Sequence, residues 1–171
     1  MSATPQDFDF DKWLDDADRP ERAVTVYQKS GLIADLDRLG ELIQNADEDE
    51  VDGPSMGGGV GKLRAEYAKI AKQFHDSALT VRVRSVSQEE QRELREKNPD
   101  LGDAALGKLV LSEALVSPKA TPEQVGKLER VLGDAQFSLI VSAWQQACRA
   151  VPAVSADFLP KRSTPDDGGA S

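Results

Sequence analysis

The sequence is poor in the residues that most often carry out chemistry. It has one cysteine and one histidine, Cys148 and His75, and only 5% of its residues are aromatic. A single cysteine excludes an internal disulfide, and a single histidine supports neither a specific Ser-His-Asp set nor a histidine-based metal site. Because Cys148 falls in an apolar helical stripe beside Trp144, we expect a buried, unreactive thiol. We therefore expect no catalytic residue, no metal and no cofactor.

Long apolar runs and excess positive charge are also missing. No segment approaches the roughly 18 apolar residues of a membrane span, and the N-terminus lacks the basic start and apolar stretch of a signal peptide. The 30 acidic and 21 basic residues give a net charge of -9. That balance argues against binding to nucleic acid or to anionic lipid. A cytoplasmic protein that contacts other proteins is the expectation.

Two partial ligand-binding patterns fail on their own requirements. The run that ends in Gly61-Lys62 imitates a phosphate-binding loop, but Met56 occupies the first glycine position and Leu63 replaces the serine or threonine that would contact magnesium. The alternating acids at 7, 9 and 11 imitate a calcium loop. Its glycine and closing glutamate would fall on Lys12 and Asp18. Neither nucleotide nor calcium binding is expected.

The strongest local signal is a helix start at Thr121. Thr121 is an N-cap, Pro122 suits the first helical position and Gln124 completes a capping box. Apolar residues then recur at helical spacing, pause at Gly133 and resume to the end of the stripe. The pattern predicts a helix over 122–132, a tight joint and a second helix over 134–149.

Two helices with matching apolar seams are predicted earlier in the chain. Their seam residues follow steps of three and four: Leu32, Leu36, Leu39 and Ile43, then Val60, Leu63, Tyr67, Ile70 and Phe74. The simplest arrangement is an antiparallel hairpin over 31–77 with a glycine-rich tip over 51–61. The same seams would also serve for pairing between chains, and the sequence leaves both arrangements open.

Alternating β-branched residues predict strands over 23–27 and 79–86. Because an antiparallel helix pair separates them, they run in opposite directions and can pair directly. A second capping box, Ser87 with Glu90, opens a charged helix over 87–97, and an apolar helix over 102–116 follows. The expected fold is mainly helical α+β: two short antiparallel strands flank a long helical hairpin, and a C-terminal helical bundle over 101–150 follows. We expect an N-terminal arm over 1–20, one domain over 21–152 and a flexible tail over 153–171.

The candidate partner contacts are aromatic and basic. The acidic arm carries Phe8, Phe10 and Trp13, which either pack on the domain itself or form an adhesive segment for another protein. Arg82 and Arg84 share the outer face of the second strand, where they can bind a partner's acids or pair with the acidic helix that follows. Phe158 is one of two large apolar residues in the tail.

The order of these segments resembles one protein family. The segments are the start Phe8-Asp9-Phe10-Asp11-Lys12-Trp13-Leu14, the strands 22–27 and 79–84, the helix start 121–125 and the end from Trp144-Gln145 to Phe158. Their order and spacing are similar to those in the tail assembly chaperones of long-tailed phages and prophages of actinobacteria. The resemblance covers about residues 8–160. None of its motifs is a catalytic signature.

The resemblance implies a non-enzymatic factor of the host cytoplasm during infection that is absent from the mature virion. It implies that the chain binds the tape measure protein, keeps it soluble and promotes assembly of the tail tube, with the major tail-tube protein as a second partner. The helical seams add an expectation of self-association. Two alternatives remain at this point: a structural tail completion or neck protein of the virion, and an acidic DNA mimic.

Overall fold

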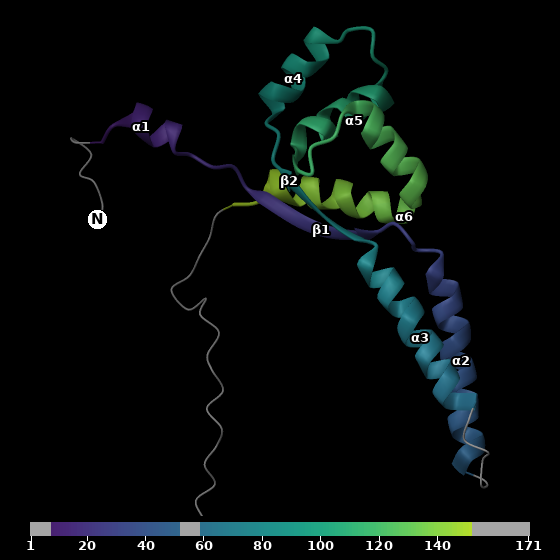
Figure 1. Cartoon of the computed structure of the whole chain (residues 1–171). Coiled ribbons are helices and arrows are strands. Elements are labelled where there is room, and N and C mark those ends of the chain that lie inside the picture. The colour runs from purple at the N-terminus through teal and green to yellow at the C-terminus, as the bar shows by residue number, and fades with distance from the viewer. Residues whose placement is uncertain (1–7, 52–58, 152–171) are drawn as a thin grey trace, which may run out of the picture.

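The computed structural model describes residues 8–51 and 59–151. They form a mainly helical α+β structure with a three-stranded antiparallel sheet, which confirms the predicted class. Residues 52–58 of the glycine-rich tip predicted over 51–61 lie outside the described residues, as does the whole predicted tail over 153–171 with Phe158. Figure 1 shows the order of the elements: α1 (Phe10–Asp15), β1 (Glu21–Tyr27), α2 (Leu32–Val51), α3 (Gly59–Asp76), β2 (Ala78–Arg84), α4 (Gln88–Lys97), α5 (Asp103–Ala114), β3 (Leu115–Ser117) and α6 (Pro122–Arg149).

The two predicted strands are present as β1 and β2 and pair with each other, although β2 ends at Arg84, two residues before its predicted end. β1 and β2 are antiparallel, with a register that runs from Glu21 opposite Arg84 to Tyr27 opposite Ala78. Side chains of a strand alternate between faces, and Val26, Val81 and Val83 are buried on one face. Leu79, which the alternation predicts to face inward as well, is 39% exposed because it lies where the helical cover ends.

The sheet has a third strand, so the expectation of two strands is wrong. The helix predicted over 102–116 ends at Ala114, and Leu115–Ser117 pairs with β2, with Val83 opposite Leu115. The residue before a proline disfavours the helical region of φ/ψ space, and a β-branched valine prefers an extended backbone. Val116 and the Ser117-Pro118 step therefore end the helix early.

The helical hairpin forms within the chain. α2 and α3 contact each other along their length, and the Arg64 guanidinium lies 2.8 Å from the Asp47 carboxylate across them. α2 continues through the acidic residues 47–50 to Val51 and α3 begins at Gly59, so the helices extend into both ends of the tip predicted over 51–61. The hairpin projects from the rest of the molecule on the side opposite α1 (Figure 1).

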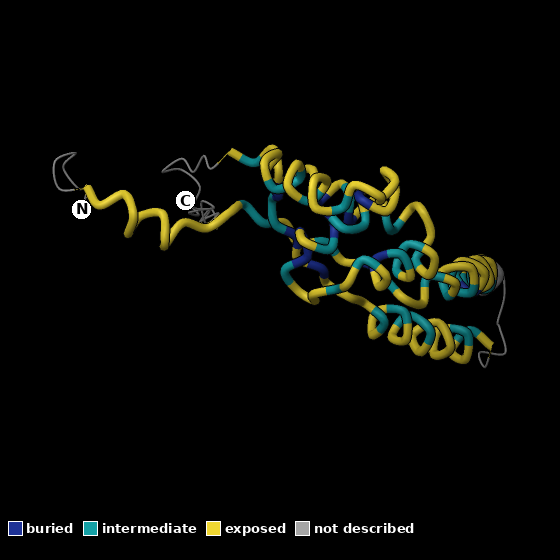
Figure 2. The backbone as a smooth tube through the Cα atoms, turned by 90° about the horizontal axis from the view of Figure 1, so that it is seen from above, coloured by how far each residue is buried: buried dark blue, intermediate teal, exposed yellow. Residues whose placement is uncertain are grey.

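The core lies between the sheet and the helices α5 and α6. Ile140 and Val125 of α6 and Ala114 of α5 are fully buried there against Val83 and its neighbours. The predicted break in α6 is present: Gly133 has φ 74° and ψ 166°, a left-handed φ that favours glycine. Figure 2 shows most of the buried segments gathered in this region, whereas the arm is exposed and the described hairpin, apart from Leu39, is exposed or half-buried.

None of the described helices combines the length and the apolar character needed to cross a membrane. Both predicted capping boxes are present. Ser87 and Glu90 cap α4, and Thr121 and Gln124 cap α6, each pair exchanging side-chain and backbone hydrogen bonds. These caps fix where the two helices begin and therefore which of their faces meets the core.

Candidate partner-binding groove

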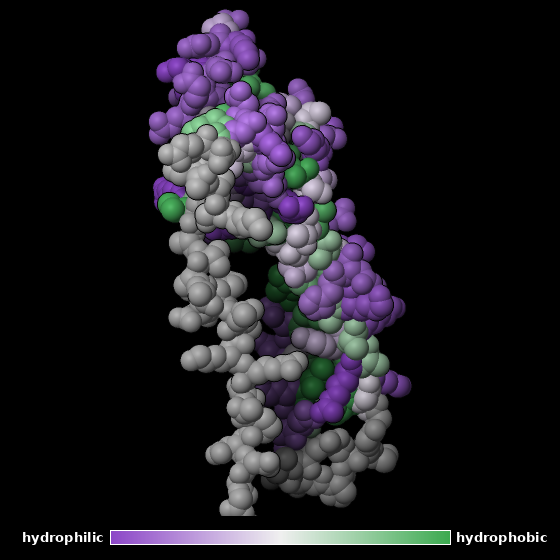
Figure 3. Space-filling view, turned by 90° about the vertical axis from the view of Figure 1, so that its left-hand side faces the viewer, coloured by the Kyte–Doolittle hydropathy of each residue, from purple (hydrophilic) through white to green (hydrophobic). Residues whose placement is uncertain are grey.

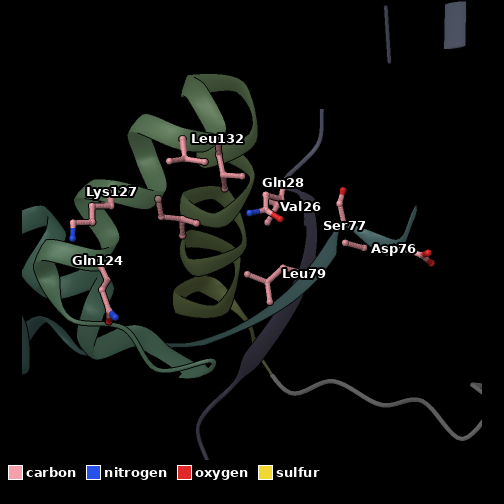
Figure 4. Close-up of a pocket in the computed structure, with 11 residues that line it drawn as sticks. Val26, Gln28, Asp76, Ser77, Leu79, Gln124, Lys127 and Leu132 are labelled. Atoms are coloured by element: carbon pink, nitrogen blue, oxygen red, sulfur yellow. The ribbon is translucent and has the colours of Figure 1, made fainter. Parts of the chain in front are cut away.

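An apolar groove opens where the sheet, the base of the hairpin and the first half of α6 meet. Its volume is about 530 Å³, within the range of pockets that hold small ligands or a few side chains. Figure 4 shows Val26 and Leu79 from the strands and Leu132 from α6 around this space, while Asp76 points away from it. The lining residues come from three parts of the chain: Val26 and Gln28; Asp76, Ser77, Ala78 and Leu79; Gln124, Lys127, Leu128, Val131 and Leu132.

The groove leaves large apolar side chains in contact with water. Val131 is 68% exposed and Leu79 is 39% exposed, although both lie beside the buried Val26. Single exposed apolar residues are ordinary on a protein surface, but a concave group of them is typical of an interaction site. The apolar character of this groove thus favours binding of apolar side chains from another molecule.

Two of the polar residues around the groove already make local hydrogen bonds. The Gln124 Oε1 atom accepts from the Thr121 backbone N–H at 2.9 Å, which closes the capping box. The Ser77 hydroxyl accepts from the Lys29 N–H at 3.1 Å and donates to the Phe74 carbonyl at 2.7 Å. These groups fix the groove walls, whereas Lys127 and Gln28 contribute polar character at its edge.

Gln136 fixes α6 against the end of β1. Its Nε2 donates to the Tyr27 carbonyl at 3.0 Å, and its Oε1 accepts from the Tyr27 N–H at 2.7 Å. The side-chain amide therefore takes the place of a neighbouring strand at this end of β1. Gly133 bends α6 three residues earlier, so the bend and this amide together set the angle between the sheet and the helix wall of the groove.

The aromatic residues predicted as partner contacts lie together on the arm. The ring centroids of Phe8 and Phe10 are 5.1 Å apart, and Trp13 lies 6.2 Å from Phe8 and 6.3 Å from Phe10. No residue of α1 is buried, and Phe10 is 65% exposed. The interpretation that the arm packs on its own domain is therefore wrong for its described residues. The three rings shield one another instead, because edge-to-face packing suits aromatic rings.

Arg82 and Arg84 do not form an open basic site. Arg82 pairs with Glu21 across the β1–β2 ladder, and Arg84 lies 3.6 Å from Glu90 of α4. The alternative in which the arginines pair with acids of the same chain is confirmed for Arg84, whose partner belongs to the acidic helix. The arginines and the aromatic cluster thus do not make one binding site.

Glu90 also holds the base of the arm. Its carboxylate pairs with Arg19 and accepts from the Ser87 N–H at 2.8 Å. Partial burial by itself raises the pKa of Glu90, but the hydrogen bonds from Ser87 and Arg19 outweigh it and lower the pKa from 4.5 to about 2. The Ser85 N–H adds a backbone bond to the Pro20 carbonyl at 3.0 Å. The arm is thus anchored at Arg19 and Pro20, with its aromatic cluster beyond the anchor.

The expectation of a buried Cys148 is wrong. Cys148 is exposed, because it falls at the edge of the α6 stripe rather than at its centre, and its thiol lies 3.8 Å from the Val86 carbonyl. His75 lies beside the stacked Tyr27 and Phe74 rings at the base of the hairpin. Within 8–51 and 59–151, no three histidine, cysteine or acidic side chains gather as they would around a metal ion.

The groove was not predicted from the sequence. Its residues belong to elements that were expected, but the concavity depends on the angle at which α6 crosses the sheet. The one available signal was Val131, which continues the apolar spacing of α6 directly before Gly133. A large apolar residue beside a helix break often remains uncovered, because the helix axis changes direction there.

Comparisons with models of protein families, with curated proteins and with solved structures found no match to this chain.

Proposed function

We propose that this chain is a tail assembly chaperone of a long-tailed phage or prophage. In this proposal it acts without catalysis: it binds an apolar helical segment of the tape measure protein, keeps that protein soluble and releases it as the tail tube assembles. The proposal of this family rests on the order of the sequence segments described above. The observation that carries the mode of action is the apolar groove between the sheet and α6.

The groove suits one face of an amphipathic helix. Recognition of this kind places two or three apolar side chains, spaced three or four residues apart, into an apolar depression. Leu79, Leu128 and Val131 offer such a surface. Full burial of each Leu or Val side chain contributes about 1.5–3 kcal/mol before the losses of association. Binding of a single segment is therefore expected to be weak and reversible, as a chaperone that must release its partner requires.

The aromatic cluster of the arm supplies a second contact. Phe8, Phe10 and Trp13 are exposed and carry large apolar surfaces. They lie on and directly before the short helix α1, beyond the Arg19–Glu90 pair. Two weak contacts on one chain raise the overall affinity for a long partner by raising the effective concentration of the second contact. A tape measure protein, which is long and helical, offers many segments to such a bivalent surface.

Co-expression with a candidate tape measure protein tests the proposal. The measurement is the fraction of that protein that stays in the supernatant after lysis. We expect the wild-type chain to raise it several-fold and Val131→Asp to remove most of the gain. Leu139→Asp is the matched control, because Leu139 is an exposed aliphatic residue of the same helix that does not line the groove.

Two outcomes would contradict this mode of action. One is a soluble fraction that the wild-type chain leaves unchanged. The other is an equal loss from Val131→Asp and Leu139→Asp, which would place the binding surface elsewhere. Mass spectrometry of purified particles separates the chaperone from a structural tail protein, since stoichiometric presence in the virion would favour the structural role.

A further inference from the structure

The helical hairpin buries very little of its own apolar surface. Leu39 is its only buried residue among those whose side chains the structure describes, and α3 has none. Two helices side by side cannot enclose a seam, so Leu36, Ile43, Ile70 and Phe74 remain half-exposed at its margins. Most helical stability in proteins comes from the packing of an apolar face. The hairpin therefore lacks the cover that α5 and α6 receive from the sheet.

One side of the hairpin is more apolar than the other. The pair between Asp47 and Arg64 marks that side, and residues at seven-residue intervals from it share the side. They are Gly40 and Ile33 on α2 and Ala71 on α3. Tyr67, three residues after Arg64, lies toward the same side of α3. We call these four residues the Ile33 face. The opposite side carries Asp35, Leu42, Glu66 and Gln73.

The Ile33 face presents apolar groups to water. Ile33 is 46% exposed and Tyr67 is 39% exposed, while Gly40 and Ala71 between them are half-buried. The side of the molecule shown in Figure 3 has hydrophobic residues between hydrophilic ones along the lower part of the view, where the hairpin lies. A second pair of helices laid on this face would cover Ile33, Tyr67 and the half-exposed seam together.

The charges of the two helices differ in sign. The described part of α2 carries five acids and one base, and α3 carries four bases and two acids: Asp35, Asp37, Glu41, Asp47 and Glu48 with Arg38, and Lys62, Arg64, Lys69 and Lys72 with Glu66 and Asp76. If a copy of the hairpin lies on the first with both tips at the same end, α2 of each copy faces α3 of the other. Opposite charges then meet across the interface.

We propose that the Ile33 face is the interface of a dimer, in which two copies of this chain pair their hairpins into an antiparallel four-helix bundle. In this arrangement Asp37 and Glu41 of one copy lie at the height of Lys72 in the other. That height follows from the Asp47–Arg64 pair, which places Gly40 level with Ala71. If the tips of the two hairpins lay at opposite ends of the bundle, α2 of one copy would face α2 of the other and acidic residues would meet. The charges therefore favour the arrangement with both tips at the same end.

The size of the face agrees with a weak but specific dimer. An 18-residue α3 that rises about 1.5 Å per residue is about 27 Å long. Two helices side by side are about 20 Å wide, so each copy contributes roughly 500 Å² in projection. The total of about 1,000 Å² lies at the lower limit of specific interfaces. We therefore expect a dimer that dissociates on dilution in the micromolar range.

Sedimentation velocity of the full chain over a range of concentrations tests this interface. The wild-type mass is expected to rise from 18.5 kDa toward twice that value. Gly40→Glu is expected to weaken dimerisation at least tenfold. A Cβ added at Gly40 meets no atom within 4 Å. Leu42→Glu is the control, because Leu42 is 41% exposed on the opposite side of α2. Circular dichroism of both variants is the accompanying check that their helices are kept.

A charge exchange tests the arrangement of the two hairpins. Glu41→Lys and Lys72→Glu are each expected to weaken dimerisation, and the double variant is expected to regain most of the loss. A monomer at all concentrations, or a Gly40→Glu variant that dimerises like the wild type, would overturn the proposed interface. A double variant as weak as the sum of its single changes would overturn the pairing of α2 with α3. Each of these readouts is independent of any tape measure protein.

Discussion

The molecule has two regions with similar apolar residues, the sheet covered by α5 and α6 and the helical hairpin, but these residues are buried to different extents in the two regions. In the sheet region, Val26, Val83 and Ile140 are at most 1% exposed because strands cover them on one side and helices on the other. In the hairpin, seam residues of the same type are half-exposed and Leu39 alone is buried among those described. Burial requires a second layer rather than a regular apolar pattern. The hairpin has the pattern and lacks the layer, which is why we assign its cover to another copy.

The largest expected effects separate these two regions. Ile140→Ala should lower the free energy of unfolding by about 3–5 kcal/mol, because Ile140 is enclosed by packed elements that cannot collapse onto the cavity. Leu39→Ala should lower it by about 2 kcal/mol, since the two helices can move together. Urea denaturation of dilute protein measures both. A loss at Leu39 that equals the loss at Ile140 would show that the two regions are equally well packed.

The next effect concerns the joint between β1 and α6. Gln136→Ala should lower the free energy of unfolding by about 2 kcal/mol, because it leaves the part-buried Tyr27 N–H and carbonyl without their partners. Gln146→Ala is the control, as Gln146 is exposed on the same helix. The same urea transitions measure both variants. If Gln136→Ala behaved like the control, the amide would contribute nothing to the angle of the groove wall.

Glu90, at the junction of the arm and the sheet, is expected to make the stability of the protein depend on pH. Its folded-state pKa of about 2 lies below 4.5, so its carboxylate contributes stability above pH 4.5 that is lost as the pH falls from 4.5 toward 2. Glu90→Gln should lower the free energy of unfolding at pH 7 by about 1 kcal/mol after solvent screening. It should also flatten the fall in melting temperature over that acid range. Glu89→Gln, on the exposed side of α4, is the matched control and should lower the free energy of unfolding at pH 7 by less than Glu90→Gln does.

The smallest effect is expected in the arm. Phe10→Ala should change the free energy of unfolding by less than about 0.5 kcal/mol, because its side chain is 65% exposed and packs against Phe8 and Trp13 of the arm itself. The melting temperature checks this. A loss above 1 kcal/mol would mean that the arm packs on the domain in solution. The aromatic cluster of the arm would then be inaccessible to a partner, which contradicts the proposed second contact.

Local signals explain how much of the fold could be predicted from the sequence. The capping boxes at Ser87 and Thr121 and the break at Gly133 depend on neighbours within four residues, and the structure has all three. The contacts that were missed are long-range ones. β3 depends on β2 more than thirty residues earlier, and the bond between Gln136 and Tyr27 spans 109 positions. No periodicity in the sequence reports such a pairing.

The candidate site was less predictable than the fold for the same reason. The aromatic cluster of the arm is local, and its three members do lie together. The arginine pair looked exposed on its strand, but a glutamate from β1 and another from α4 occupy it. The groove needs three elements at particular angles, so its residues become a site only once the chain has folded.

Hydrogen exchange of the chain, alone and bound to a tape measure protein, tests the central claim most directly. We predict that backbone amides of residues 76–80 and 124–132, which border the groove, become protected at least several-fold in the complex. Those of α4, which follows the other end of β2 and packs on α5, should exchange at unchanged rates. Protection that leaves both groove segments unchanged would contradict the assignment of this groove as the partner-binding surface.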